Sequence, residues 1–221
     1  MNALTRRLVL KELHHARGAV LITVAGGLVS LGVMPLGKVA FNVGSLCWLS
    51  AMVAFGVIIS LTAIVNERKE NALLFALSLP LSPADYRRAK LLGILASFLL
   101  AWVPLSLATF AVILSTDMPD GLLSFAVLLN LFLLTNFSFV LTGSLMLKSE
   151  GAITGLIIVT NMGITLFMFM IGGLSGINAH LHGPTPVWNA THTWVLVAEL
   201  ICLAATLSLP FVTRARNRDY P

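Results

Sequence analysis

The chain has 221 residues, of which 57% are apolar and only 10% are charged. Soluble domains carry about 25% charged residues, so this composition excludes a water-soluble globular protein, and its apolar content excludes a disordered one. The formal net charge of +5 would suit nucleic acid, but the sequence has no basic patch with interleaved aromatic residues. We attribute the charge to membrane topology and to contact with anionic lipid.

Six apolar stretches, each long enough to cross a bilayer, lie between clusters of charged residues. They cover residues 19–37, 43–65, 91–115, 122–147, 152–174 and 193–213. The sequence therefore predicts an all-α integral membrane protein with about six transmembrane helices, folded as one membrane domain over residues 1–221. A signal peptide is the alternative interpretation of the first stretch, but no A-x-A cleavage site follows it.

The basic residues fall on one side of the predicted membrane, which the positive-inside rule assigns to the cytoplasm. The opposite side receives one basic residue, Lys38, together with Asp117 and Asp120. We therefore expect both termini to be cytoplasmic. The residues on the cytoplasmic side are Arg6, Arg7, Lys11, Arg17, Arg68, Lys69, Arg87, Arg88, Lys90, Lys148, Arg214, Arg216 and Arg218.

The longest cytoplasmic connection, residues 66–90, joins the second span to the third. A charged cluster leads into an apolar run that is typical of a short amphipathic helix, and Pro80 ends it. Ser82 is a capping residue with Pro83 at the first helical position, so a new helix should begin there and run into the third span. An amphipathic helix on the membrane face rests either on lipid or on a partner protein.

This connection resembles the corresponding loop of type-2 ATP-binding-cassette (ABC) export permeases. In that family a charged turn of the Glu-Arg-x-x-Gly-Thr type is followed by x-Leu-x-x-Leu-x-x-x-Pro-Leu-Ser, and an aromatic residue and a lysine open the third span. Asn71 and Ala72 stand here in place of Gly-Thr, and Asn is the next best residue after Gly for a left-handed turn. The residues that match the pattern are Glu67, Arg68, Leu77, Pro80, Leu81, Ser82, Tyr86 and Lys90.

The resemblance implies the membrane subunit of an exporter in the bacterial inner membrane. Residues 66–90 would form a coupling helix seated on a separate cytoplasmic ATPase, and residues 1–18 an interfacial helix before the first span. A second permease copy or a paralogue would complete the transporter. ATP and Mg²⁺ would bind the ATPase, and we expect no cofactor, metal or catalytic residue in this chain. The implied coupling residues are Glu67, Arg68, Glu70, Leu73, Leu77, Pro80, Ser82 and Tyr86.

One string has the spacing of a phosphate-binding loop without its chemistry. Residues 32–38 read GxxxxGK, but Val39 follows at the position where a hydroxyl must hold Mg²⁺. The string also lies at the outer end of the first span, away from cytosolic ATP. We therefore expect ATP hydrolysis to take place on another subunit.

Polar side chains inside the predicted spans are candidates for a substrate path. Asn130 and Asn136 lie in the fourth span, Asn161 in the fifth and Glu199 in the sixth. Amides in lipid need partners, so they face other helices or a cavity, and helix packing is the more frequent explanation. Glu199 indicates either a substrate or proton site or a structural residue bonded to a neighbour. A mostly uncharged route would suit an amphipathic or hydrophobic cargo.

Other functions stay open at this point. His180 and His182 in an outer loop are the local support for a haem exporter of the cytochrome c maturation type, although two histidines alone rarely hold a metal. A secondary transporter should show internal repeats, broken helices or several ionisable groups at mid-membrane, and only Glu199 answers that description. A membrane scaffold would not need the polar fourth span.

Overall fold

A computed structural model describes residues 3–66, 83–147 and 149–212. Within these ranges the chain forms helices and no strand. Three short elements are the 3-10 helix η1 (Met34–Leu36), the π-helix η2 (Leu61–Asn66) and α8 (Ser175–Asn178). The long helices are α1 (Ala3–Val33), α2 (Lys38–Ser60), α5 (Pro83–Ser115), α6 (Leu122–Met146), α7 (Glu150–Gly173) and α9 (Ala190–Val212).

The six predicted spans are confirmed, because six helices are long and apolar enough to cross a membrane. Pro83 is helical and is the first residue of α5 in the described range, and the capping role of Ser82 stays a prediction. Residues 3–18 are also helical, but they continue into the first span without a break, as one helix from Ala3 to Val33. Their position at the membrane interface stays a prediction.

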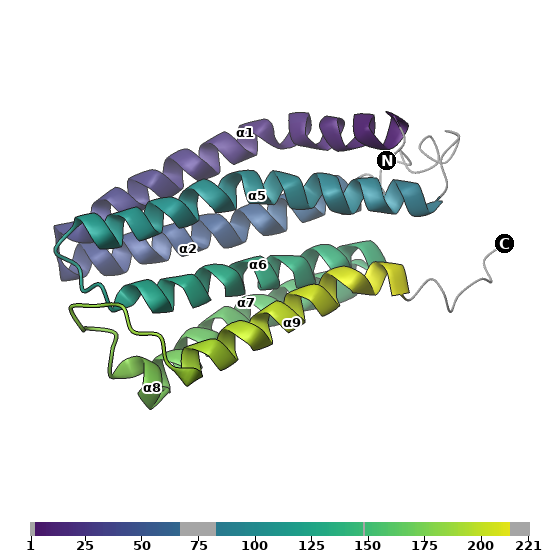
Figure 1. Cartoon of the computed structure of the whole chain (residues 1–221). Coiled ribbons are helices and arrows are strands. Elements are labelled where there is room, and N and C mark those ends of the chain that lie inside the picture. Colours follow the sequence, from purple (N-terminus) through teal and green to yellow (C-terminus); the bar gives the residue numbers. More distant parts are fainter. Residues whose placement is uncertain (1–2, 67–82, 148, 213–221) are drawn as a thin grey trace.

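The long helices form a bundle with two groups, α1, α2 and α5 on one side and α6, α7 and α9 on the other (Figure 1). The start of α1, the start of α5 and the end of α9 lie at one end of the bundle, which we call the terminal end. The turn between α1 and α2, the connection between α5 and α6, and α8 lie at the opposite end, the α8 end. An even number of spans places the start of the first span and the end of the last span at the same end of the bundle.

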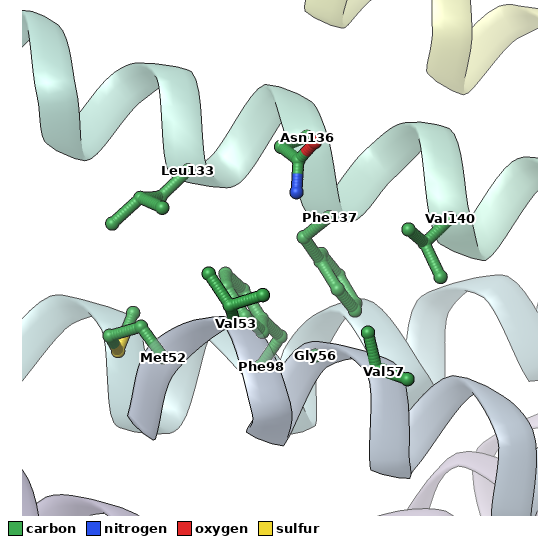
Figure 2. A pocket seen from close by; sticks show the side chains of 9 residues that line it. All are labelled: Met52, Val53, Gly56, Val57, Phe98, Leu133, Asn136, Phe137 and Val140. Carbon is green, nitrogen blue, oxygen red and sulfur yellow. The ribbon is translucent and has the colours of Figure 1, made fainter. Parts of the chain in front are cut away.

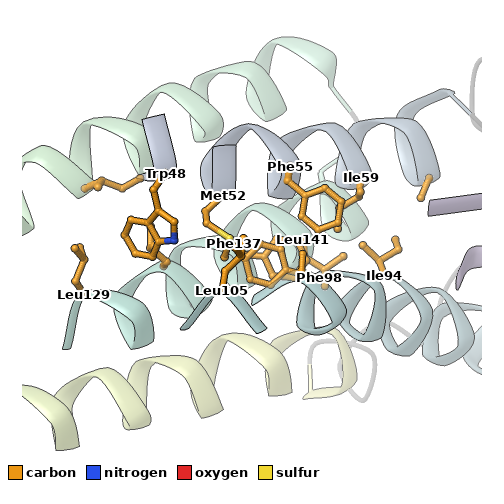
Figure 3. Packing of buried hydrophobic residues seen from close by; sticks show 14 of the residues in the cluster. Trp48, Met52, Phe55, Ile59, Ile94, Phe98, Leu105, Leu129, Phe137 and Leu141 are labelled. Atoms are coloured by element: carbon orange, nitrogen blue, oxygen red, sulfur yellow. The ribbon is translucent and has the colours of Figure 1, made fainter. Parts of the chain in front are cut away.

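The main core lies between α1, α2, α5 and α6 and is built around stacked aromatic rings (Figure 3). Phe98 of α5 stacks on Phe137 of α6, with ring centroids 3.9 Å apart, and lies 6.0 Å from the ring of Phe55 on α2. Gly56 permits this approach, since a Cβ there would lie 2.9 Å from the Phe137 ring and 3.2 Å from the Phe98 ring. Close packing of this kind holds helices together where lipid competes for apolar contact.

The helices α7 and α9 are the least buried. In the most apolar stretch of each span, 11% of residues are buried in α7 and 17% in α9, against 67% in α6. The side chains that they expose are large and apolar, with Phe169 81% and Trp194 74% exposed. Such a surface is matched by lipid chains or by another membrane helix, so the burial pattern agrees with a membrane-embedded bundle.

The GxxxxGK string forms the turn between α1 and α2. It includes the end of α1, all of η1 and Gly37, whose φ of 138° lies in the region that glycine tolerates best. A phosphate-binding loop follows a β-strand, whereas a long helix precedes this turn. The string is therefore a helical hairpin turn.

Candidate functional site

A cavity of about 420 Å³ lies between α2 and α7. Its walls are mostly aliphatic, and three polar residues interrupt them: Ser50 from α2, with Asn161 and Thr165 from α7. Asn161 and Thr165 are one helical turn apart and so share a face of α7. The space is wide open at the surface of the two helices, and no charged residue belongs to the described lining. The cavity is suited to a neutral or amphipathic molecule.

Asn161 has a buried polar atom beside this cavity. Its Oδ1 is buried and has no hydrogen-bond partner within the described ranges. A buried amide oxygen without a donor costs about 1–3 kcal/mol. Because this oxygen is closed even to a water molecule, a bound molecule would donate to it only after the Asn161 side chain turns toward the cavity.

Asn136 faces a much smaller space between α6 and α2. This cavity measures about 10 Å³ and is enclosed by side chains that include Met52, Phe98 and Phe137 (Figure 2). One water molecule needs at least about 10–15 Å³. In this conformation Asn136 therefore belongs to the packed α2–α6 contact and not to an open passage.

Asn130 connects α6 to α5 through hydrogen bonds. The Ser106 hydroxyl donates to Asn130 Oδ1 at 2.6 Å, and Trp102 Nε1 donates to the Asn130 main-chain oxygen at 2.9 Å. The Asn130 amide nitrogen donates to the main-chain oxygen of Ala126 at 2.8 Å. The structure thus gives this buried amide the partners that helix packing requires.

Glu199 lies on the face of α9 that packs against α6. It is 6% exposed, and neither carboxylate oxygen has a hydrogen-bond partner among the residues that the structure describes. His192 and Thr206 lie seven residues to either side and are buried on the same face. Of the four candidate path residues, only Asn161 lines the α2–α7 cavity, and the structure does not bring the other three together with it.

A buried ion pair occupies the terminal end of the bundle. Lys90 Nζ donates to Glu12 Oε1 at 2.7 Å and to the main-chain oxygen of Ala63 at 2.8 Å. Lys90 is 5% exposed and Glu12 is 7% exposed. One nitrogen therefore connects α5 with α1 and with η2.

In the sequence, Lys90 belongs to the cytoplasmic basic residues and to the family's loop pattern, whereas Glu12 belongs to neither set. A signal was present, because Glu12 is the one acid within residues 1–18, where the other charged side chains are basic. A single acid in a basic segment beside a membrane span needs an opposite charge. The identity of its partner, 78 positions away, required the structure.

The start of α5 also contacts the end of α9. The guanidinium carbon of Arg88 lies 5.8 Å from the ring centroid of Phe211, within cation–π range. Two residues later, Lys90 turns toward α1 and η2. The first turns of α5 thus contact both helix groups at the terminal end.

The implied coupling residues are only partly described. Tyr86 lies in the first turn of α5 and is half-buried. The connection itself begins directly after η2 and ends at the start of α5. Seven of the eight residues lie outside the described ranges, so their role stays a prediction: Glu67, Arg68, Glu70, Leu73, Leu77, Pro80 and Ser82.

The two outer histidines lie in the turn after α8, at the α8 end of the bundle. This loop packs on the α5–α6 connection, where the amide of Gly121 donates to the Gly183 oxygen at 3.0 Å. Within residues 3–66, 83–147 and 149–212, no group of three or more His, Cys, Asp or Glu side chains could hold a metal ion. In these ranges the fold therefore brings no third metal-binding side chain to His180 and His182.

A family model of ABC-2 family transporter proteins matches residues 8–212. The chain belongs to the ABC-2 transporter family. The resemblance drawn from residues 66–90 is thereby confirmed over almost the whole chain. This ABC-2 protein is a multi-pass membrane permease subunit, and members of the family work with a cytoplasmic ABC ATPase. Comparisons with curated proteins and with solved structures give no match.

Proposed function

We propose that this permease exports a neutral, amphipathic or hydrophobic molecule, using ATP hydrolysed on a separate cytoplasmic ATPase. The observation that carries the proposal is the uncharged, open cavity of about 420 Å³ between α2 and α7, with Asn161 in its lining. A charged cargo would find no counter-ion in this lining. A cargo with an apolar body and one donor group would satisfy both the aliphatic walls and Asn161.

The terminal end of the bundle is the cytoplasmic end in this proposal. Four basic residues lie in the first half of α1 at that end, and the start of α5 adds Arg88 and Lys90. The α8 end carries Lys38 with Asp117 and Asp120. The positive-inside rule then orients the protein with both ends of the chain in the cytoplasm, as in a bacterial inner membrane.

A second permease copy or a paralogue would complete the passage. The helix α7 packs on α6 along one side and exposes most of its remaining surface. The cavity at its edge is formed by α2 and α7 from one copy only. A second subunit against this face would enclose the cavity and turn it into a shared route.

The mechanism that fits this arrangement is alternating access. Closure of the ATPases around ATP would displace the connection between α2 and α5, together with residues 3–18, and the attached helices would move as rigid bodies. The cavity would then change its exposure from the cytoplasmic to the outer side. Hydrolysis would reset the helices.

Purification from native membranes followed by reconstitution tests the proposal. We expect a subunit with nucleotide-binding motifs to co-purify, and the ATPase rate of the complex in lipid vesicles to rise with neutral amphipathic dyes used as probes. Asn161→Leu should reduce that rise, and Met162→Leu, 62% exposed beside it on α7, should not. Purification without a nucleotide-binding subunit would overturn ATP-driven export. Equal dye stimulation in Asn161→Leu would overturn the cavity as the route.

A further inference from the structure

The Lys90 ammonium group lies where three elements meet at the terminal end. It bonds Glu12 on α1 at 2.7 Å and the Ala63 oxygen on η2 at 2.8 Å, while its own backbone belongs to α5. Both charged side chains are almost fully buried. A buried charge that loses its partner is strongly unfavourable, so Glu12 and Lys90 must move together.

The Ala63 oxygen that Lys90 bonds belongs to the π-helix η2. In a π-helix the backbone bonds run from i to i+5, and such segments occur mostly as short insertions, frequently at functional sites. Lys90 donates to the main-chain oxygen of Ala63, inside this segment. Residues of η2 lead directly into the connection on which the ATPase is proposed to act. Movement there reaches Lys90 through this hydrogen bond.

The packing beside the ion pair is loose. A cavity of about 130 Å³ lies between α1, α5 and the end of α2, and Glu12, Thr62, Ala63 and Ser97 are among its lining residues. By contrast, the cavity beside Phe98 in the middle of the bundle measures about 10 Å³. Close-packed regions resist deformation, and helices beside a void can shift. The ion pair therefore connects three elements at a point where they have room to move.

We propose that the Glu12–Lys90 pair, with the Ala63 oxygen, is a mechanical joint that makes α1, η2 and α5 respond as one unit when the ATPase acts on the permease. This inference rests on the proposed function. Lys90 is a positioning residue in this role, since it acts through the helices that it connects and not on the cargo. The joint would pass movement from the α2–α5 connection into the N-terminal helix.

The test measures cysteine labelling in the complex of permease and ATPase in lipid vesicles. Cys47 and Cys202 are replaced by serine, and Ser50→Cys places a reporter in the α2–α7 cavity. Its maleimide labelling rate is measured without nucleotide and with ATP plus orthovanadate. In the parent we expect the nucleotide to change this rate.

The decisive variant is the double replacement Glu12→Met with Lys90→Met. It removes both members of the ion pair together, so neither Glu12 nor Lys90 is left as a buried charge without the other, and it removes both hydrogen bonds of the joint. We expect the nucleotide effect on labelling to be lost. Lys90→Arg keeps a charged donor for Glu12 and Ala63 and should keep the effect. Arg17→Met removes an exposed charge from α1 and should also keep it.

The outcomes separate the two proposals. A nucleotide effect of parental size in the Met pair overturns the joint, as does loss of the effect in Lys90→Arg or Arg17→Met. If the parent itself lacks an ATPase subunit or any nucleotide effect, the proposed function fails, and the joint fails with it. If the ion pair only stabilised the fold, the Met pair would take its place and the nucleotide effect on labelling would remain complete.

Discussion

The Thr142 hydroxyl on α6 donates to the main-chain oxygen of Thr206 on α9 at 3.1 Å. The two helices run in the same direction (Figure 1), so one step of seven residues back along each places Thr135 opposite Glu199. Both of these side chains are buried. The α6–α9 contact therefore has two buried polar levels two helical turns apart, and Glu199 is the ionisable residue of the second level.

Glu199→Leu should keep or increase stability. The carboxylate has no hydrogen-bond partner in the described part of the chain, and an unsatisfied buried polar group costs about 1–3 kcal/mol. Removing the group should recover up to that amount, as measured by unfolding of the purified protein in detergent. Ile201→Leu, 62% exposed on the same helix, is the neutral control. A marked loss of stability would mean that the carboxylate has a partner in the folded protein.

Gly56→Ala and Gly155→Ala should have effects of opposite sign. A Cβ at Gly56 would lie 2.9 Å from the Phe137 ring, so the stacked core must shift, at a cost of about 1–3 kcal/mol. A Cβ at Gly155 meets nothing within 4 Å, and alanine is favoured over glycine inside a helix by about 1 kcal/mol. Thermal unfolding of the two variants in the same detergent measures the difference. Equal stability would contradict the described contact between α2 and α6.

Cysteine labelling in intact cells should distinguish the two ends of the bundle. Asp120→Cys, in the α5–α6 connection, should react with a membrane-impermeant maleimide from outside. His14→Cys, exposed on the first half of α1, should react only after the membrane is permeabilised. Both variants are made with Cys47 and Cys202 replaced by serine. The reverse pattern would invert the proposed orientation.

The spans could be predicted from sequence because each depends on a local property. Twenty or so apolar residues between charged clusters suffice for a bilayer, and proline is favoured in the first turn of a helix, where Pro83 lies in α5. The N-terminal boundary of the first span was less predictable. Charged residues do not end a helix, and α1 therefore runs through them from Ala3.

The site depends on helix packing, which local patterns do not determine. Asn130 and Asn161 look alike in sequence, yet the first bonds Ser106 across the α5–α6 contact and the second borders an open cavity. The difference arises from which face each helix turns toward its neighbour. The Glu12–Lys90 pair joins positions 78 apart, so no local spacing could have predicted it.

The connection between α2 and α5 gives the sharpest test of coupling to the ATPase. Its predicted amphipathic helix has a charge at the end of the second span, Glu67, and an apolar side that includes Leu77. If these residues contact the ATPase, Glu67→Ala should weaken that contact by more than the roughly 0.5 kcal/mol usual for an exposed surface charge. Leu77→Asp should weaken it further, because it places a charge in an apolar contact.

Both connection variants should still insert into the membrane, since the six spans are unchanged. We expect them to co-purify less ATPase or to stimulate its hydrolysis less in lipid vesicles, with pull-down and ATPase rate measured on matched amounts of permease. Asp219→Ala, a charge removal near the end of the chain, is the control. If both variants bind and stimulate the ATPase like the parent, the connection is not the coupling element, and movement must enter the bundle through α1 alone.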